Sequence, residues 1–401
     1  MTPSTPSEEG FRTATGRRRR DAPVSAPAAG LPDPSGDELS TTGPMALELQ
    51  AVLEEAVAQN ASDVHLVPGR PPFLRVNGEL QRYGSDRLAS ADIRRLVYSV
   101  LSAQVQRRFH REGELDASFA VKGLGRFRLN LYREQNGMGA VLRVIPPEIP
   151  SPEELGISPE LQHIADLPRG LVLVTGPTGS GKSTTLACLI NIVNLSRRLH
   201  ILTMEDPIEY VFPSGSCVVT QREVGSHTRS FAESLRRGMR QDPDVILVGE
   251  MRDLETIAAA LTLVETGHLV FATLHTTDAA QSVDRIIDVF PPFQQQQVRT
   301  QLASVLRVVI CQQLLPRADG AGRVAAREVM VVNPGVANLI REGKTHQIYS
   351  AIELGARTGM ISLDRHLVEL VRRGTVTRHD AVARAANPTG LQALLDLKEE
   401  R

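Results

Sequence analysis

The chain has 401 residues, which at roughly 150 residues per domain allows two or three domains with hydrophobic cores of their own. Its 45 basic and 46 acidic residues nearly balance, so no overall field favours nucleic acid or an acidic membrane. Three widely spaced cysteines, without a Cys-x-x-Cys pair, exclude a disulfide framework and a zinc ribbon. No apolar run reaches the ~18–20 residues of a membrane span, and no apolar segment follows the N-terminal charges as in a secretory signal. We therefore expect a soluble protein of the reducing cytoplasm.

The first 44 residues are rich in Pro, Ser, Thr, Gly and charged residues and hold almost no large apolar side chains. Such a segment cannot bury enough apolar surface to offset its ordering entropy, so we predict that residues 1–44 are disordered. The run Arg17–Arg20 could bind anionic lipid or nucleic acid, although charge runs of this kind are more often only solvated.

Ordered structure is predicted from Met45, and the pattern over residues 45–144 is that of a compact α+β domain. Apolar residues recur at helical spacing in two segments, 47–57 and 90–112. Alternating apolar residues bounded by turn residues predict strands at 63–67, 72–78, 115–121, 125–132 and 140–144. A proline-rich stretch then begins a stiff linker, 145–165.

Strands and helices alternate from about residue 166, which is typical of a parallel sheet. Candidate strands are 171–175, 200–204, 245–248 and 269–273, and the helices between them are 183–195, 229–240 and 253–265, the last with Asp253 as a plausible N-cap. Further helices are expected at 278–288 and 294–315. These elements predict an α/β core over 166–333, followed by a mainly helical region, 334–401.

The strongest motif fits G-x-x-x-x-G-K-[ST] and lies between the apolar strand Leu171–Val174 and a helix. Glycines let backbone N–H groups point at a phosphate, and the helix N-terminus adds partial positive charge. Lys182 would reach the β- and γ-phosphates, and the Ser183 hydroxyl would hold Mg²⁺. The residues expected to bind the nucleotide are Gly176, Pro177, Thr178, Gly179, Ser180, Gly181, Lys182, Ser183 and Thr184.

A second set of residues supplies candidate chemistry. Glu250 follows the apolar strand 245–248 and could polarise a water for attack on the γ-phosphate, although a surface glutamate is the simpler alternative. Gly249 stands where P-loop ATPases usually carry an aspartate, so Mg²⁺ would rest mostly on Ser183, phosphate oxygens and water. The acidic segment Thr203–Tyr210 could face the metal or could equally be a solvated turn.

Two histidines and three arginines flank these strands. His268 and His275 stand at the two ends of the strand 269–273, and His275 could contact the γ-phosphate. Arg236, Arg237 and Arg240 lie on the helix before residue 245, where a solvated face is the favoured interpretation.

Together these residues resemble the secretion ATPases of the type II/type IV pilus superfamily, most closely its PilT-like retraction branch. The resemblance covers about residues 46–390. It rests on a Walker A loop (176–184), an aspartate box (203–210), an atypical Walker B end (248–250) and a histidine box (267–276). Shorter matches lie at 61–66, 126–130, 242–245, 249–256, 288–291 and 338–344.

The resemblance implies an α/β protein in which an N-terminal PAS-like α+β domain is joined by a linker to a RecA-like P-loop ATPase domain with a helical C-terminal tail. It further implies a homo-hexamer that binds ATP and Mg²⁺ between the domains. Arginines matching those that neutralise phosphate charge are Arg128 and Arg143, with Arg126 a third candidate. The carboxylates carried over are Glu205, Asp206 and Glu209. Glu250 would be catalytic and His275 a γ-phosphate contact, and the expected metal-site residues are Ser183, Glu205 and Glu250.

The function implied is ATP-driven retraction of type IV pili at the inner face of the cell membrane. The expected partners are an inner-membrane platform protein and other pilus ATPases. Alternatives are an extension or type II secretion assembly ATPase, an accessory nucleotide-binding regulator, or a nucleic-acid translocase. Assembly ATPases typically carry a four-cysteine zinc element and a longer N-terminal domain, and neither is present in this sequence. The balanced charge and the absence of tryptophan give little sign of a nucleic-acid channel. The family's C-terminal signature lacks one upstream arginine here, because the segment begins Gly335-Val-Ala-Asn338.

Overall fold

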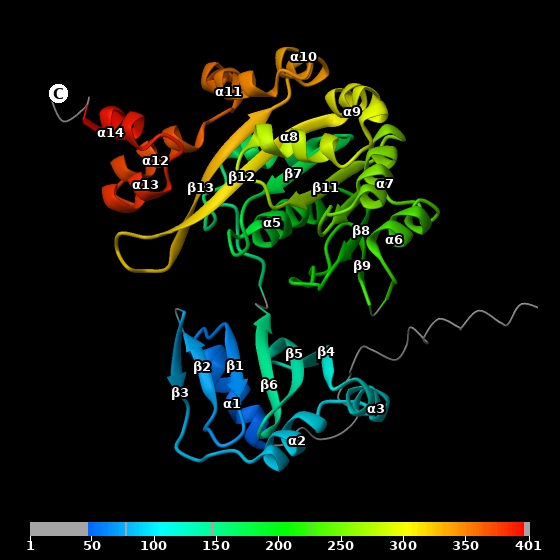
Figure 1. The fold of residues 1–401 in the computed structure, drawn as a ribbon, viewed down its shortest axis with the longest axis vertical. Coiled ribbons are helices and arrows are strands. Elements are labelled where there is room, and N and C mark those ends of the chain that lie inside the picture. Colours follow the sequence, from blue (N-terminus) through cyan, green and yellow to red (C-terminus); the bar gives the residue numbers. More distant parts are fainter. Residues whose placement is uncertain (1–46, 77, 146–147, 226, 397–401) are drawn as a thin grey trace, which may run out of the picture. The chain divides into compact units, whose positions relative to one another are not determined.

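A computed structural model of the protein describes residues 47–76, 78–145, 148–225 and 227–396 (Figure 1). These residues form an N-terminal α+β domain and a larger α/β domain that continues into a group of short helices. The segment 1–44 predicted to be disordered, its Arg17–Arg20 run and the start at Met45 lie outside the described residues.

The N-terminal domain is a six-stranded antiparallel sheet with the strand order β3-β2-β1-β6-β5-β4 and with helices that cover its apolar side chains. Its core holds Leu53 of the first helix, Val64, Phe127 and Leu142, all fully buried. The elements are α1 (Leu47–Ala58), β1 (Asp63–Leu66), β2 (Phe73–Val76), β3 (Glu79–Arg82), α2 (Ser90–Tyr98), α3 (Ala103–Glu112), β4 (Glu114–Val121), β5 (Gly125–Glu134) and β6 (Gly137–Ile145).

The helical pattern over 90–112 forms two helices rather than one, and the cause is local. Ser102 adopts an extended conformation between them, and its hydroxyl accepts the backbone N–H of Val105, which starts α3. Gly113 ends α3 in the left-handed conformation with φ 82°, which glycine adopts without steric cost.

The larger domain has a seven-stranded sheet in the order β13-β12-β7-β11-β10-β8-β9. All neighbouring strands run parallel except β12 and β13, which are antiparallel. The elements are α4 (Pro159–Gln162), β7 (Gly170–Thr175), α5 (Lys182–Ser196), β8 (His200–Glu205), β9 (Val218–Glu223), α6 (Phe231–Gly238), β10 (Val245–Val248), α7 (Leu254–Glu265), β11 (Leu269–Leu274), α8 (Ala279–Asp288), α9 (Pro292–Val305), β12 (Leu306–Pro316) and β13 (Arg323–Val331).

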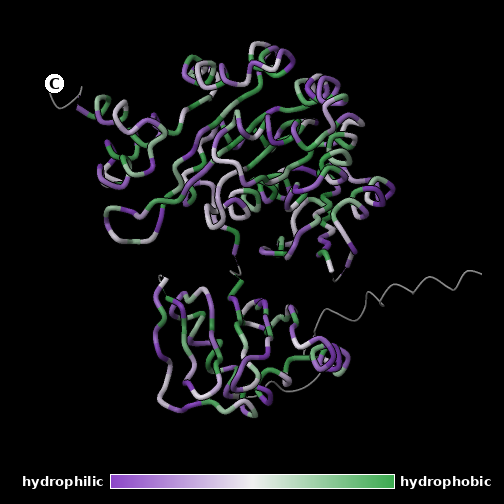
Figure 2. The backbone as a smooth tube through the Cα atoms, in the orientation of Figure 1, coloured by the Kyte–Doolittle hydropathy of each residue, from purple (hydrophilic) through white to green (hydrophobic). Residues whose placement is uncertain are grey.

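Helices cover both faces of this sheet, and its central strands are accordingly mostly apolar (Figure 2). Every residue of β7, β10 and β11 is buried. Leu171 and Leu173 of β7 join one hydrophobic cluster, whereas Val172 and Val174 join the cluster on the opposite face. This alternation places β7, and the loop that follows it, in the middle of the domain.

One prediction in this domain is wrong. The segment 294–315, expected to be a single helix, is helical only as α9 and then becomes β12, which pairs in parallel with β7. The apolar run from Val308 to Cys311 is better buried against β7 than it would be on an exposed helix, since it lies between β7 and β13. Strands β9 and β13, and β3 of the N-terminal domain, were also not predicted.

The region after residue 333 is helical, as predicted, with α10 (Pro334–Arg341), α11 (Ile348–Leu354), α12 (Leu363–Arg372), α13 (Arg378–Arg384) and α14 (Pro388–Asp396). Its last three helices pack around Leu367 and Leu391 in a separate hydrophobic cluster that includes Leu315 of β12. Among the described helices, none is long and apolar enough to cross a bilayer.

The chain that enters the larger domain is held to it by a buried arginine. The guanidinium of Arg327, on β13, donates to the backbone carbonyls of Leu155 at 2.7 Å and Gly156 at 3.0 Å. Just before, Ser151 and Glu154 cap one another's backbone N–H groups. Residues 151–156 therefore form an ordered turn attached to the larger domain.

Candidate functional site

The loop between β7 and α5 has the backbone of a phosphate-binding loop, and its glycines are required by close packing. Gly176 has φ 142°, and a Cβ atom there would lie 2.3 Å from the main-chain oxygen of Gln312. Gly181 precedes α5 with φ 84°. Both positions exclude other residues, because the backbone is left-handed and β12 lies directly against the loop.

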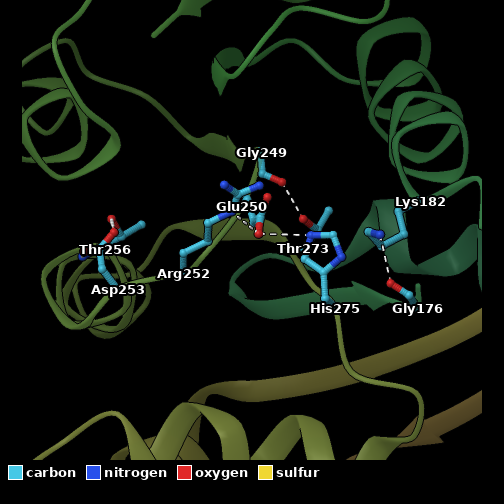
Figure 3. A network of polar contacts seen from close by, with 9 residues as sticks. All are labelled: Gly176, Lys182, Gly249, Glu250, Arg252, Asp253, Thr256, Thr273 and His275. Carbon is cyan, nitrogen blue, oxygen red and sulfur yellow. Dashed lines mark hydrogen bonds and ion pairs between the residues drawn. The ribbon is translucent and has the colours of Figure 1, made fainter. Parts of the chain in front are cut away.

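Lys182 lies at the first position of α5 and its side chain is turned back over the loop (Figure 3). Its ammonium donates to the carbonyls of Gly176 at 2.9 Å and Pro177 at 3.1 Å. Burial lowers the pKa of Lys182, and the nearby carboxylates of Glu250 and Glu209 oppose that effect. The next helical turn is tied to the aspartate box, since the hydroxyls of Thr184 and Tyr210 are 3.0 Å apart.

The carboxyl ends of three further parallel strands bring the other candidates to the same edge of the sheet. Glu205 is the last residue of β8, while Glu250 and His275 follow β10 and β11. Since β11 lies between β7 and β10, His275 comes from the strand next to β7 and Glu250 from the strand beyond it. This is the edge at which open α/β sheets bind ligands.

Arg252 and His275 stabilise the ionised form of Glu250 (Figure 3). Its Oε1 accepts from Arg252 and lies 3.0 Å from His275 Nε2. Burial raises the pKa of Glu250, but Arg252 and His275 outweigh it, so the net pKa is lowered. Its side chain is 17% exposed. A partly buried, ionised carboxylate of this kind can orient or deprotonate a water molecule.

The backbone at Gly249, where an aspartate is usual, packs closely against the end of β8. A Cβ atom at Gly249 would lie 3.1 Å from the carbonyl oxygen of Met204 and 3.2 Å from Cα of Glu205. The backbone N–H of Gly249 also donates to that Met204 carbonyl, at 2.7 Å. The end of β10 thus approaches β8 closely, and a larger residue would push on the segment that carries Glu205.

Glu205 is the most perturbed carboxyl of the site. It is 9% exposed, and burial raises its pKa to about 7, partly offset by hydrogen bonds. Its Oε1 accepts from the hydroxyl of Thr203 at 2.6 Å and from the amide of Gln221 at 3.2 Å. A nearby cation would favour the ionised form, so the charge of Glu205 depends on what binds at this edge.

Of the remaining candidates, the acidic residues Asp206 and Glu209 lie near the site, whereas His268 lies at the other end of its strand. Asp206 and Glu209 are exposed in the loop after Glu205. His268 lies at the opposite end of β11, where its Nδ1 is 2.8 Å from the carbonyl of Leu263 at the end of α7. That position makes His268 a structural residue.

The structure also shows the contacts of the α6 arginines and of the predicted N-cap, Asp253. Arg236 and Arg237 form exposed ion pairs with Glu255 and Glu233, which confirms the solvated face. Asp253 caps α7, because its carboxylate accepts both the backbone N–H and the hydroxyl of Thr256.

Arg128 and Arg143 belong to the N-terminal domain, where they are cross-strand neighbours on β5 and β6. Arg143 forms a 2.9 Å ion pair with Asp63, and Arg128 lies 3.7 Å from Asp116. The third candidate, Arg126, lies two residues before Arg128 on β5, so it is on the same face of the sheet. Its guanidinium donates a hydrogen bond to the hydroxyl of Ser118.

The donors at the site suit a magnesium ion held jointly with a nucleotide. Within the described ranges, no three His, Cys, Asp or Glu residues gather closely enough to hold a metal by themselves. Mg²⁺ usually keeps several waters and takes one or two protein oxygens plus phosphate oxygens. A hydroxyl at the start of α5 and the carboxyl groups of Glu205 and Glu250 are oxygen donors of this type.

Two polar residues that hold the site together were not found from the sequence: Gln221 and Gln312. Gln221 bonds Glu205 and both the carbonyl of Tyr210 and the N–H of Phe212. Gln312 is 1% exposed and bonds the phosphate-binding loop from β12. Their sequence neighbourhoods carry no motif, and β9 and β12 were not recognised as strands, so no signal placed them at the site.

A phosphate-binding loop in the middle of a parallel sheet, with an ionised glutamate two strands away, defines a P-loop ATPase with a RecA-like core. Comparison with known proteins identifies a family within this class. The profile of the family described as type II/IV secretion system protein matches residues 38–386. The type IV pilus retraction ATPase PilT of Pseudomonas aeruginosa is 48% identical over 342 residues, which cover 85% of this chain and 99% of that protein. The twitching motility protein of Neisseria gonorrhoeae is 46% identical, over 86% of this chain and 92% of that protein.

The fold agrees with these sequence matches. A crystal structure of the pilus retraction motor PilT with bound ADP matches with a TM-score of 0.80 and 44% identity, over 86% of this chain and 98% of that chain. The chain therefore belongs to the type II/IV secretion system protein family and is an ATP-hydrolysing enzyme, with an N-terminal domain and a RecA-like ATPase domain.

Proposed function

We propose that this protein is the motor that retracts type IV pili, using ATP hydrolysis to withdraw subunits from the filament. The observation that carries the proposal is the Lys182–Glu250–His275 edge of the sheet, which has the parts an ATPase needs. Matches of 48% and 46% identity to a pilus retraction ATPase and a twitching motility protein support its use in retraction.

In the proposed reaction, backbone N–H groups of residues 176–184 hold the phosphates and Lys182 neutralises their charge. Glu250 orients the attacking water and accepts its proton as the bond from the water oxygen to the γ-phosphorus forms and the bond to the ADP oxygen breaks. His275, which contacts Glu250, reports whether the γ-phosphate is present. Mg²⁺, held by Ser183 with Glu205 and Glu250 nearby, would supply charge neutralisation at the phosphate oxygens.

Arg128 and Arg143 would stabilise the charge that develops on the phosphates when the N-terminal domain approaches the nucleotide. An arginine supplied from another domain acts only when the gap closes, which couples hydrolysis to domain movement. In the protein alone these arginines pair with Asp116 and Asp63, so closure would exchange carboxylate partners for phosphate.

Six copies would form the working ring, at the cytoplasmic face of the inner membrane, in contact with the pilus platform protein and other pilus ATPases. The likeness to the pilus retraction motor over 86% of the chain supports this assembly.

The test replaces the chromosomal gene with the Glu250→Gln form and follows fluorescently labelled pili in living cells. Pili that extend but never shorten would support retraction, whereas cells without surface pili would make the protein an assembly motor instead. Glu255→Gln, the same substitution at an exposed glutamate of α7, is the matched control and should leave pilus dynamics normal.

A further inference from the structure

Gln312 is a buried glutamine that belongs to neither the phosphate-binding loop nor the residues expected to touch nucleotide. It lies on β12, the strand that pairs with β7 on the side away from Glu250. Its amide Nε2 donates to the carbonyl of Ser180 at 2.7 Å, and its Oε1 accepts the hydroxyl of Thr185 at 2.9 Å. Gln312, Thr185 and Ser180 are 1%, 2% and 3% exposed, so water does not compete for these bonds.

The chemistry of the two partners fixes the orientation of the amide. The Ser180 carbonyl can only accept a hydrogen bond, so the NH₂ group must face it. The remaining amide oxygen then faces Thr185, whose hydroxyl can donate. A carboxylate or a thioether at position 312 could not make both bonds.

The hydrogen bond from Gln312 to the carbonyl of Ser180 determines where the N–H group of Gly181 points. The carbonyl of Ser180 and the N–H of Gly181 belong to one planar trans peptide unit, in which they point in opposite directions. Holding the carbonyl toward β12 therefore aims the Gly181 N–H away from β12, toward the interior of the loop where a phosphate binds. Gly181 needs this restraint more than most residues, because glycine at φ 84° has an unusually permissive backbone.

We propose that Gln312 is a positioning residue that sets the phosphate-binding loop in its nucleotide-binding conformation, acting through the Ser180–Gly181 peptide and Thr185. The backbone of the same residue contributes as well, since its carbonyl leaves no room for a side chain at Gly176. The inference deepens the ATPase assignment, because it concerns the affinity of the same loop for nucleotide.

The test measures the affinity of the purified full chain for a fluorescent ADP analogue, together with thermal unfolding without nucleotide. Gln312→Met keeps the volume and removes both bonds, and should weaken binding about tenfold. Gln313→Met is the matched control: it makes the same change one residue along β12, on the opposite face, and should bind as the wild type does. An affinity of Gln312→Met within about twofold of the wild type, even with a lowered unfolding temperature, would overturn the proposal.

A second pair of variants keeps the test decisive if Gln312→Met does not fold. Thr185→Val replaces the hydroxyl by a methyl group and should weaken binding by about threefold or more, whereas Thr185→Ser keeps the hydroxyl and should bind nearly as the wild type does. Equal affinities of the Val and Ser forms would also contradict the proposal. Failure of the wild-type chain to bind ADP would instead refute the ATPase assignment itself.

Discussion

Glu205 gives the sharpest quantitative prediction, because its burial links the stability of the fold to pH. Its pKa is raised from 4.5 to about 7 in the folded protein. Between those two values the unfolded chain releases the proton while the folded chain keeps it, so the folded state binds more protons and loses stability as pH rises. Since each tenfold change in proton affinity is worth about 1.4 kcal/mol, ionised Glu205 costs the folded state about 3 kcal/mol above pH 7.

The perturbation is Glu205→Gln, which removes the charge and keeps an oxygen for the hydrogen bonds from Thr203 and Gln221. The difference in free energy of unfolding between this variant and the wild type should grow in the variant's favour by up to about 3 kcal/mol from below pH 4.5 to above pH 7. The variant must be compared with the wild type at each pH, because burial also raises the pKa of Glu328 to about 7, and ionisation of Glu328 destabilises both proteins equally.

Urea unfolding at pH 5 and pH 8, followed by circular dichroism, measures this difference; the chain has no tryptophan for fluorescence. Glu255→Gln, at an exposed carboxylate of α7, should show no comparable pH dependence. If the Glu205→Gln variant gains no stability over the wild type between the two pH values, Glu205 is ionised at both, and the argument from burial is wrong.

The remaining predictions concern turnover. Lys182→Ala should abolish measurable nucleotide binding in a titration with labelled ADP, because the loop loses its only ammonium; retained affinity would contradict its role. Glu250→Gln should lower the ATPase kcat by about 10²–10⁴ while ADP still binds, and normal turnover would refute the assigned base. Arg128→Ala and Arg143→Ala should reduce kcat more than nucleotide affinity, with the exposed Arg111→Ala of α3 as control; a loss of affinity alone would remove them from the transition state.

The residues that bind phosphate were predictable because their motif is local and follows from backbone geometry. The loop 176–184 needs glycines with positive φ between a strand and a helix, and all of these are visible in sequence. Glu250 and His275 were found for a related reason, since each directly follows an apolar run that forms a buried strand.

Gln312 could not be predicted because the boundary before its strand carries no sequence signal. Val298, Leu302 and Val305 recur at helical spacing, and the apolar run of β12 begins at the next residue without an intervening Gly or Pro. Only pairing with β7 decides that the chain extends there. Gly249 is a similar case: the missing aspartate was evident from the sequence, but the close approach of β8 is a tertiary contact that only the structure shows.

Arg327, which binds the chain between the two domains, limits the length of the tether that joins the N-terminal domain to the larger domain. Arg327 holds the carbonyls of Leu155 and Gly156, the turn before them begins at Ser151, and Ile149 already packs against the core of the larger domain, so only three residues connect Ile149 to the end of β6 at Ile145. The segment from Ile145 to Ile149 spans at most about 14 Å when fully extended. A tether of this reach keeps the two domains of one chain at an effective concentration in the millimolar range. The domain that carries Arg128 and Arg143 therefore stays within reach of the ATPase domain of its own chain, and lengthening the tether would lower this effective concentration without altering a single contact.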